Sequence, residues 1–492
     1  MTQISEHHDI IILGAGISGI NTAHVLREKL PNRTFTILEG RSVIGGTWNF
    51  FKFPGIRSDS NMTTFGFHWH PWPHAHKIAT ASEIVAYITD AAKTDGTYDR
   101  IRFNHQAVDV EWRDEDSFWR LTVENQGVSK TLAANFVICC TGYYAYDQAM
   151  PAVIPGIESF EGTVAHPQWW PEELDCSGKR VVLIGSGATA YTIVPALADK
   201  VGQLTMVQRS PSYAAAISTT SWVDALLRMV LPVSLAHKIC WWKDLAEEMI
   251  VGQFMLCFPR IARFALRWMT KSALPKDCDV DIDFNPRYNP FQQRLCLCPD
   301  GDFFKVMHQD NIELVTDVID TVTRDGVLLQ SGRKLDADII ITATGLYFQI
   351  MNGMTANVNG VLIQPGDRYT WRGTMLEGLP NMGYILGYVI QSWTPGAEAT
   401  AQLLVRVIKS MEKKKATKTM PVLLHRKNMP RKLAVDVTSN YFVKAADRVP
   451  KVTGEDPWYG RTNWIRDMWS VLFGDIDKGL EFSGIKQDKK NI

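Results

Sequence analysis

The sequence lacks an excess of charge of either sign. Its 492 residues contain 52 Lys and Arg and 52 Asp and Glu, and charged residues make up 21% of the chain. A balanced chain has no long-range field that would attract nucleic acid or an anionic membrane. We therefore expect no nucleic-acid partner. The length is sufficient for two or three globular domains.

Cysteine motifs and long apolar runs are also missing. Cys139 and Cys140 are adjacent and Cys296 and Cys298 are separated by one residue, so neither pair has the spacing of a zinc site or a dithiol redox motif. The N-terminal segment has no basic region ahead of its apolar run, and that run is too short to span a bilayer. We expect reduced thiols, a cytoplasmic protein and no transmembrane segment.

One stretch has the ligand types of a metal site. The segment "FHWHPWPHAH" contains four histidines, namely His68, His70, His74 and His76. Zinc sites favour such ligands, but Pro71 and Pro73 stiffen the stretch and aromatic residues surround the histidines. We therefore expect an aromatic loop and no metal site.

A dinucleotide-binding turn lies at the start of the chain. The apolar run "HDIIIL" leads into Gly14-x-Gly16-x-x-Gly19, a helical pattern follows, and Glu39 closes the next apolar run, "TFTIL". Gly14 permits a tight turn, and Gly16 lets the backbone approach a pyrophosphate at the helix N-terminus. Glu39 is placed to accept a hydrogen bond from a ribose hydroxyl.

The arrangement occurs a second time with a different charge. "KRVVLIG" leads into Gly185-x-Gly187-x-x-Ala190, and the following run, "LTMVQ", ends in Arg209 and Ser210 in place of a glutamate. An arginine at this corner attracts a 2′-phosphate that a carboxylate repels. The second turn therefore favours NADPH, although a surface arginine without a ligand is the alternative.

Two such turns predict an α/β fold with two Rossmann-like dinucleotide-binding domains, the first for FAD and the second for NADP, with hydride passing between the cofactors. The second domain contains a helical insertion. The expected boundaries are 1–145 for the first part of the FAD domain, 146–213 for the first part of the NADP domain, 214–299 for the insertion, 300–338 for the second part of the NADP domain, and 339–492 for the second part of the FAD domain with the C-terminal segment.

The insertion is apolar at helical spacing from 222 to 270, and Pro232 and Pro259 divide it into separate helices. It is predicted to cover the active site. Peripheral contact with a membrane and an entrance for hydrophobic substrate are the alternatives.

Two longer motifs carry a resemblance to a known family. The first combines Gly45-Gly46-x-Trp48 with Phe53-Pro54-Gly55 and Asp59, and the second is Phe160-x-Gly162-x-x-x-His166-x-x-x-Trp170-Pro171. Both resemble signatures of the type I Baeyer–Villiger monooxygenases, in the flavin-containing monooxygenase superfamily. The segments "PRYNPFQQRLCLCPDGDFF" and "GLPNMGYILGYVIQSWT" resemble the branch with ethionamide-activating and long-chain-ketone enzymes.

The resemblance implies roles for particular residues. Gly46, Trp48 and Asp59 would contact the cofactors, and Arg294 would be the catalytic arginine, oriented by Asp59; Arg287 is the nearby competitor. His166 would belong to a hinge between the two domains instead of acting as a general base. Phe160, Gly162 and Trp170 are the other members of that signature.

The function implied is insertion of one atom of O₂ beside a ketone carbonyl, giving an ester or lactone through a peroxide at flavin C4a. The partners would be FAD, NADPH, O₂ and a small-molecule ketone; the oligomeric state stays open. Oxygenation of sulfur or nitrogen centres is the alternative main activity, and a non-catalytic dinucleotide-binding redox sensor is a remote one. A flavin disulfide reductase is disfavoured because no Cys-x-x-Cys occurs.

Overall fold

The larger of the two main sheets starts from the N-terminal apolar run. The computed structural model describes residues 4–276, 278–293, 295–388, 390–435 and 443–485. Strand β1 (Ile4–Leu13), helix α1 (Ile17–Lys29) and strand β2 (Phe35–Leu38) form the predicted strand–turn–helix–strand unit, with β1 and β2 parallel. Residues Ile10–Leu13 are buried because β1 lies between β2 and β6 (Val128–Cys139).

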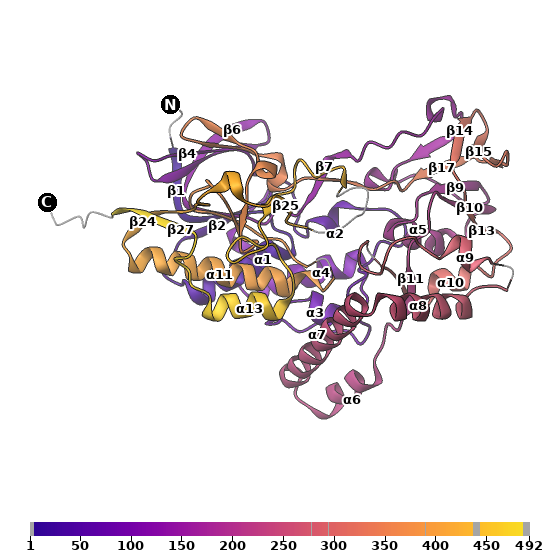
Figure 1. The fold of residues 1–492 in the computed structure, drawn as a ribbon, viewed down its shortest axis with the longest axis horizontal. Helices are drawn as coiled ribbons and strands as arrows, with labels where there is room; N and C mark the ends of the chain where they lie inside the picture. The colour runs from indigo at the N-terminus through magenta and orange to yellow at the C-terminus, as the bar shows by residue number, and fades with distance from the viewer. Residues whose placement is uncertain (1–3, 277, 294, 389, 436–442, 486–492) are drawn as a thin grey trace.

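The strand order of this sheet is β20-β19-β4-β5-β6-β1-β2-β3, and β23 pairs with β6. The remaining members are β3 (Ile101–Arg102), β4 (Gln106–Arg113), β5 (Phe118–Asn125), β19 (Thr355–Val358), β20 (Val361–Ile363), β21 (Thr370–Trp371), β22 (Met375–Leu376) and β23 (Met382–Tyr384). Helix α11 (Trp393–Lys413) packs beside α1 in the same lobe, and α13 (Trp464–Phe473) packs on α11 (Figure 1).

The second sheet is parallel throughout and forms the core of the other lobe (Figure 1). Its order is β13-β10-β9-β17-β8. The strands are β8 (Thr163–Ala165), β9 (Arg180–Ile184), β10 (Gln203–Gln208), β13 (Ile312–Thr316) and β17 (Ile339–Thr342), and α5 (Ala188–Leu197) follows β9. The fold has the predicted α/β class.

One expected boundary differs from the structure. The second part of the first domain was expected from residue 339, but β17 begins there and pairs with β8 and β9 in the second sheet. Its four residues are buried, because strands flank β17 on both sides. The chain therefore returns to the first lobe after residue 342.

The two crossings between the lobes lie side by side. Strand β7 (Tyr144–Ala149) leaves the first lobe, β18 (Leu346–Phe348) comes back to it, and the two pair antiparallel. We call this pair the crossing ribbon.

The insertion has the predicted helices. It contains β11 (Ala214–Ile217), α6 (Trp222–Val230), α7 (Val233–Cys257), α8 (Pro259–Ala273), α9 (Val280–Asp283) and β12 (Cys296–Pro299). Pro232 and Pro259 stand at the N-termini of α7 and α8, which confirms the predicted breaks. Among the described residues no single helix is long and apolar enough to cross a membrane; α7 and α8 reach that length and composition only as a pair bent by 111°.

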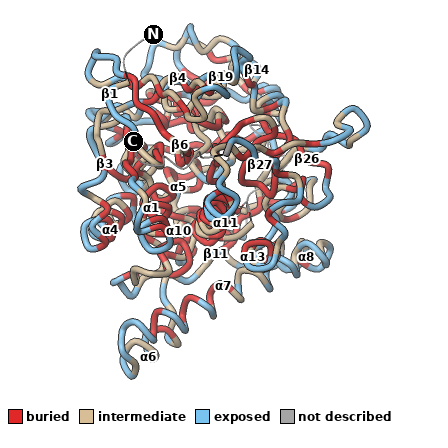
Figure 2. The backbone as a smooth tube through the Cα atoms, turned by 90° about the vertical axis from the view of Figure 1, so that its left-hand side faces the viewer, coloured by how far each residue is buried: buried red, intermediate tan, exposed pale blue. Residues whose placement is uncertain are grey.

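The described chain contains further α-helices and strands. They are α2 (Thr47–Phe50), α3 (Met62–Phe65), α4 (Ala81–Thr94), α10 (Asp302–Val306), β14 (Ile319–Thr323), β15 (Gly326–Leu329), β16 (Lys334–Asp336), β24 (Ala416–Pro421), β25 (Lys432–Leu433), β26 (Lys451–Val452) and β27 (Leu480–Ile485). Buried backbone follows the sheets and α11, whereas α6 and the adjoining part of α7 extend beyond the body of the molecule (Figure 2).

A buried ion-pair network ties the insertion to the first lobe. The Asp244 carboxylate on α7 lies 2.9 Å from Lys77 Nζ and 2.6 Å from Lys243 Nζ, and it accepts a hydrogen bond of 2.7 Å from Asn61. Both lysines also reach Asp224 on α6, at 2.9 Å and 2.7 Å. Both carboxylates are almost fully buried. Lys77 and Asn61 come from the first lobe, so the network fixes α6 and α7 against it.

We expect Asp244→Ala to lower the free energy of unfolding by about 3–5 kcal/mol, because Lys77 and Lys243 would then share the single buried carboxylate of Asp224 and Asn61 would lose its acceptor. Chemical denaturation followed by circular dichroism measures the change. The matched control is Glu161→Ala, which removes the partner of Arg324 in an exposed ion pair and should have little effect. Equal effects of the two substitutions would contradict a structural role for the network.

Candidate functional site

A cavity of about 1400 Å³ extends between the two sheets and the insertion. This exceeds the 300–1,000 Å³ typical of a site for one drug-sized ligand. Its wall includes the turn after β1, Glu39, the segment 45–48, the first turn of α5, and apolar side chains of the insertion. The insertion contributes Trp222, Val251, Met255, Leu266 and Met269.

The first glycine turn is shaped by close backbone approaches. Gly14 has φ of +101°, and a Cβ added at Gly19 would lie 1.9 Å from the Gly14 carbonyl oxygen. Gly16 faces Gly46 so closely that a Cβ on Gly46 would lie 3.1 Å from the Gly16 Cα. Gly16 begins α1 without a side-chain cap, and the first turn contains no acidic residue. The N–H groups at this helix end are therefore oriented for an anion such as a pyrophosphate.

The Glu39 carboxylate lies beside this turn and is 7% exposed. It accepts hydrogen bonds from the backbone N–H of Ala15, at 2.8 Å, and of Arg41, at 3.1 Å. Both oxygens are thus held at the end of β2, on the cavity wall, where the sequence predicts a ribose contact.

Sequence reasoning missed an aromatic and cationic group next to Glu39. The guanidinium of Arg41 donates to the Gly46 carbonyl at 2.8 Å and lies 5.4 Å from the ring centre of Tyr146. Tyr146 stacks on Phe50 with 4.1 Å between ring centres. These residues come from three segments, so their spacing in the sequence carries no signal of the stack.

Trp48 and Asp59 of the first family signature also line the cavity. Trp48 is half-buried and meets Phe65 edge-on, with 5.6 Å between ring centres. Asp59 lies in a bend of the wall, and its carboxylate accepts a hydrogen bond of 3.4 Å from Ser60 Oγ.

The second glycine turn has the same design. Gly185 has φ of +143°, and a Cβ there would lie 2.3 Å from the Ala343 carbonyl oxygen. Gly187 begins α5 without a side-chain cap, and a Cβ on it would meet nothing within 4 Å. Ala190 is buried, whereas Arg209 and Ser210 are exposed directly after β10. The second glycine turn is therefore accessible to a ligand, and Arg209 places a positive charge after the next strand.

His166 forms part of a short 3₁₀ helix (Pro167–Trp169) as its N-cap. Its Nδ1 accepts the Gln168 N–H at 3.1 Å, and its Nε2 is buried with no hydrogen-bond partner among the described residues. Burial lowers the pKa of the ring, which favours the neutral imidazole. The geometry gives this histidine a structural contact within the loop.

The loop that contains the second signature is hydrogen-bonded to the crossing ribbon. Gln168 Nε2 donates to the Ala145 and Gln148 carbonyls at 3.0 and 3.1 Å, and Trp169 Nε1 donates to the Tyr146 carbonyl at 3.2 Å.

The other signature residues pack against the second lobe. Trp170 and Phe160 pack at the edges of two apolar clusters in that lobe. Gly162 is required by space, since a Cβ would lie 2.4 Å from the Asp338 carbonyl oxygen.

A buried carboxylate on α7 is a second feature that sequence reasoning missed. Glu248 Oε1 accepts hydrogen bonds from Thr64 Oγ1 at 2.5 Å and from Ser392 Oγ at 2.8 Å, and Oε2 accepts the Ser392 N–H at 2.9 Å. Burial raises the pKa of Glu248 despite these hydrogen bonds. The residue lines the cavity and joins α7 to the start of α11.

The two candidate arginines have different surroundings. Arg294 lies outside the described residues. Its neighbours Gln293 and Leu295 line the cavity. Arg287 is exposed and is not part of the cavity wall.

The histidine-rich loop serves other contacts. His70 Nε2 lies 3.0 Å from an Asp90 carboxylate oxygen, and His74 stacks on His76 with 5.1 Å between ring centres. Within the residues that the structure describes, no group of three or more His, Cys, Asp or Glu side chains is placed to hold a metal ion.

The fold and cavity are those of a two-dinucleotide flavoprotein, and comparison with known proteins agrees. The sequence profile of the flavin-binding monooxygenase-like family matches residues 7–229. The FAD-containing monooxygenase EthA of Mycolicibacterium smegmatis is 40% identical over 96% of both chains, and that of Mycobacterium tuberculosis is 37% identical over 98% of both. The probable FAD-binding monooxygenase AlmA of Acinetobacter baylyi is 36% identical over 97% of this chain and 96% of its own.

Solved structures agree in fold. Cyclohexanone monooxygenase with bound ε-caprolactone has a TM-score of 0.75 at 18% identity, covering 97% of this chain and 100% of its own. OTEMO in complex with FAD and NADP has a TM-score of 0.74 at 18% identity, covering 97% and 99%. The chain belongs to the flavin-binding monooxygenase-like family, in the branch of the EthA monooxygenases. The predicted family resemblance is thereby confirmed.

We expect Gly19→Ala to destabilise the protein by about 1–3 kcal/mol, because the added methyl group overlaps the Gly14 carbonyl oxygen and forces the turn apart. Gly187→Ala is the matched control, since the same atom at the equivalent helix start meets open space. Differential scanning calorimetry of both variants measures the effect. An unchanged melting temperature for Gly19→Ala would show that the turn relaxes without cost.

Proposed function

We propose that this protein is an FAD- and NADPH-dependent monooxygenase of the Baeyer–Villiger type, acting on an apolar ketone. The observation that carries the proposal is that the first glycine turn and the first turn of α5, which follows Gly187, line a single cavity whose exposed wall is largely apolar. Such a cavity accommodates two dinucleotides and an apolar substrate next to them. The monooxygenase relatives and the two family signatures support the same assignment.

The first lobe is proposed as the FAD domain. Gly14, Gly16 and Gly19 would receive the pyrophosphate at α1, and Glu39 would hold the ribose hydroxyls. Gly46 would let its segment pass close to Gly16 beside the cofactor, because a side chain there would meet the Gly16 backbone. Trp48 and Asp59 would border the flavin side of the cavity.

The second lobe with its insertion is proposed as the NADP domain. Gly185, Gly187 and Ala190 would form the pyrophosphate turn at α5, and Arg209 with Ser210 would bind the 2′-phosphate. When bound, the two cofactors supply the hydride transfer and the activation of O₂. One oxygen atom of O₂ would enter the ketone, giving an ester or lactone, and the other would leave as water, with one NADPH oxidised to NADP⁺ and one proton taken up.

Arg294 is proposed as the catalytic residue, with Asp59 to orient it. A guanidinium stays protonated at all working pH values and presents several donors to negative charge that develops on oxygen. The neighbours Gln293 and Leu295 support this position because they line the cavity. The apolar wall from the insertion would exclude water, which strengthens that interaction.

Product analysis with NADPH and ¹⁸O₂ tests the function. The panel should contain linear, cyclic and aryl ketones with one sulfide and one tertiary amine. An ester or lactone that carries one labelled oxygen is expected. Sulfoxide or N-oxide with no ester from any ketone would instead support oxygenation of sulfur or nitrogen as the main activity. If NADPH never bleaches the bound flavin, the non-catalytic redox sensor would be the remaining assignment.

We expect Arg209→Ala to reduce the preference for NADPH over NADH by about tenfold or more, because one charge-assisted hydrogen bond is worth about 1.5–3 kcal/mol. The ratio of kcat/KM for the two coenzymes measures it. Arg333→Ala, an exposed arginine paired with Glu313 in the same lobe, is the control. An unchanged ratio would exclude Arg209 from 2′-phosphate binding.

We expect Arg294→Ala to lower ester formation by about 10²–10³-fold, the usual effect of losing one donor to a developing oxyanion. Arg287→Ala should behave as the wild type, because Arg287 is exposed away from the cavity. Anaerobic bleaching of the flavin by NADPH should survive in both variants and separates a defect in oxygenation from a defect in reduction. The reverse pattern between the two arginines would reassign the catalytic residue.

A further inference from the structure

Most of the exposed large hydrophobic side chains in the described part of the chain lie on four helices, α6, α7, α8 and α13. Trp222 on α6 is 79% exposed, Phe264 on α8 is 70% exposed, and Trp469 on α13 is 66% exposed. We call the exposed side of these four helices the apolar face. Monomeric proteins rarely expose so much contiguous apolar surface without a partner.

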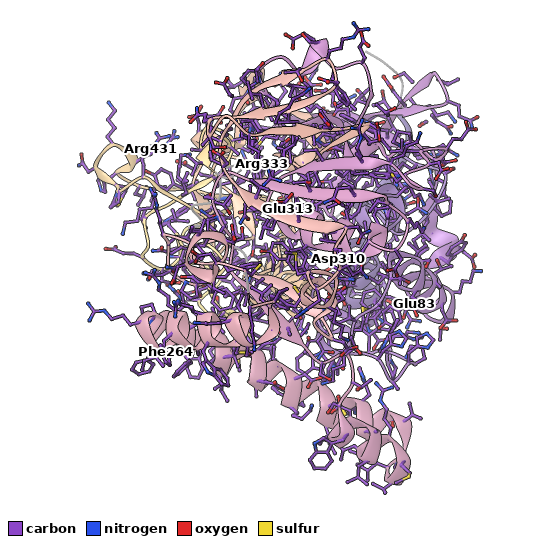
Figure 3. All side chains as sticks on the ribbon, turned by 90° about the vertical axis from the view of Figure 1, so that its right-hand side faces the viewer. Glu83, Phe264, Asp310, Glu313, Arg333 and Arg431 are labelled. Atoms are coloured by element: carbon purple, nitrogen blue, oxygen red, sulfur yellow. The ribbon has the colours of Figure 1, made fainter. Side chains whose placement is uncertain are left out.

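The four helices form one continuous side of the molecule. Helix α6 packs on α7, and α7 packs on α8. Trp242 on α7 meets Trp464 on α13 with 5.2 Å between ring centres. In Figure 1 the four helices lie along the lower edge, and Figure 3 shows Phe264 on the outer side of α8.

The charge on α8 identifies the chemistry of the partner. This helix carries Arg260, Arg263, Arg267 and Lys271 and no acidic residue, and Arg267 pairs with Asp281 of the adjoining α9 at 2.7 Å. Arg260 and Lys271 are exposed, and neither forms an ion pair among the described residues. A helix with cations on one side and large apolar and aromatic residues on the other is the pattern of segments that lie in the interface of an anionic membrane.

A second copy of this chain fits the same surface less well. A two-fold contact between two apolar faces would bring the cations of one α8 towards those of the other, with no acidic residue on that helix to compensate. An anionic lipid surface satisfies both the charge and the apolar side chains.

The apolar face is also an outer wall of the cavity. Trp222, Val251 and Met269 are exposed at the surface and line the cavity as well. An apolar molecule dissolved in the bilayer would therefore reach the cavity wall without crossing bulk water.

We propose that the apolar face docks this protein on an anionic phospholipid bilayer and that apolar substrate enters the cavity from the lipid. The docking is independent of the proposed function, whereas the entry of substrate rests on it. The overall charge balance of the chain does not oppose docking, because the cations of α8 act locally, within a Debye length of the surface.

Flotation with vesicles tests the docking. The purified holoenzyme is mixed with vesicles of phosphatidylcholine alone or of phosphatidylcholine with phosphatidylglycerol. Binding is expected to the anionic vesicles and is expected to fall as salt is raised. Two double variants should each lower the partition coefficient for the anionic vesicles by about tenfold or more. They are Phe264→Ser/Trp268→Ser and Arg260→Glu/Lys271→Glu. None of these four residues lines the cavity.

Val361→Ser and Lys179→Glu are the matched controls, because Val361 and Lys179 are exposed residues on other elements. Circular dichroism and thermal unfolding show whether the variants fold. Absence of vesicle binding by the wild type, or equal binding by all variants, would overturn the proposal. So would a stable dimer in sedimentation velocity, without lipid, that dissociates in the Phe264→Ser/Trp268→Ser variant, since a second copy would then cover the face.

Substrate entry is tested separately with a long-chain ketone held in the vesicles and a short, water-soluble ketone. Arg260→Glu/Lys271→Glu should raise the apparent KM for the vesicle-bound ketone and leave kcat and KM for the soluble ketone unchanged. An equal change for both ketones would overturn entry from the lipid. If no ketone is oxidised by any variant, the proposed function fails, while the flotation result still decides the docking.

Discussion

The arrangement of the cavity depends on the buried carboxylate of Asp244. Removing a carboxylate from water is costly unless its hydrogen-bonding and ionic partners are all in place. Its partners Lys77 and Asn61 belong to the first lobe, while Asp244 itself belongs to the insertion of the second. Glu248, farther along α7, makes a second polar attachment at Thr64 and Ser392. Helix α7 thus has a defined position over the cavity, with polar contacts inside and apolar side chains outside.

Each lobe presents the N-terminus of a helix to the site in the same way. Helices α1 and α5 both begin at a glycine, without a side-chain cap and without an acidic residue in the first turn. Each therefore offers unpaired N–H groups and the positive end of its dipole to an anion. The difference between the lobes lies in the charge that follows the next strand, Glu39 in one and Arg209 in the other.

Features whose residues all lie within one short segment could be predicted from the sequence. The strand, the glycines and Glu39 lie within one unit, and Pro232 and Pro259 divide the helical pattern of the insertion because proline fits the first turn of a helix better than its interior. Contacts between distant segments could not be predicted this way. The stack of Arg41 on Tyr146, the Asp244 network and the place of β17 between β8 and β9 depend on how the sheets assemble. The motif spacing marked His166, but its N-cap contact depends on a loop fixed by the crossing ribbon.

The crossing ribbon has a mechanical consequence. Two paired strands bend out of their plane with their hydrogen bonds intact, whereas sliding one strand along the other breaks those bonds. Because the chain passes between the lobes through β7 and β18 as a pair, a rotation of one lobe against the other would bend this ribbon as a unit instead of moving two independent tethers. Such a rotation would also separate Asp244 on α7 from Lys77 and Asn61 of the first lobe, so these contacts oppose it.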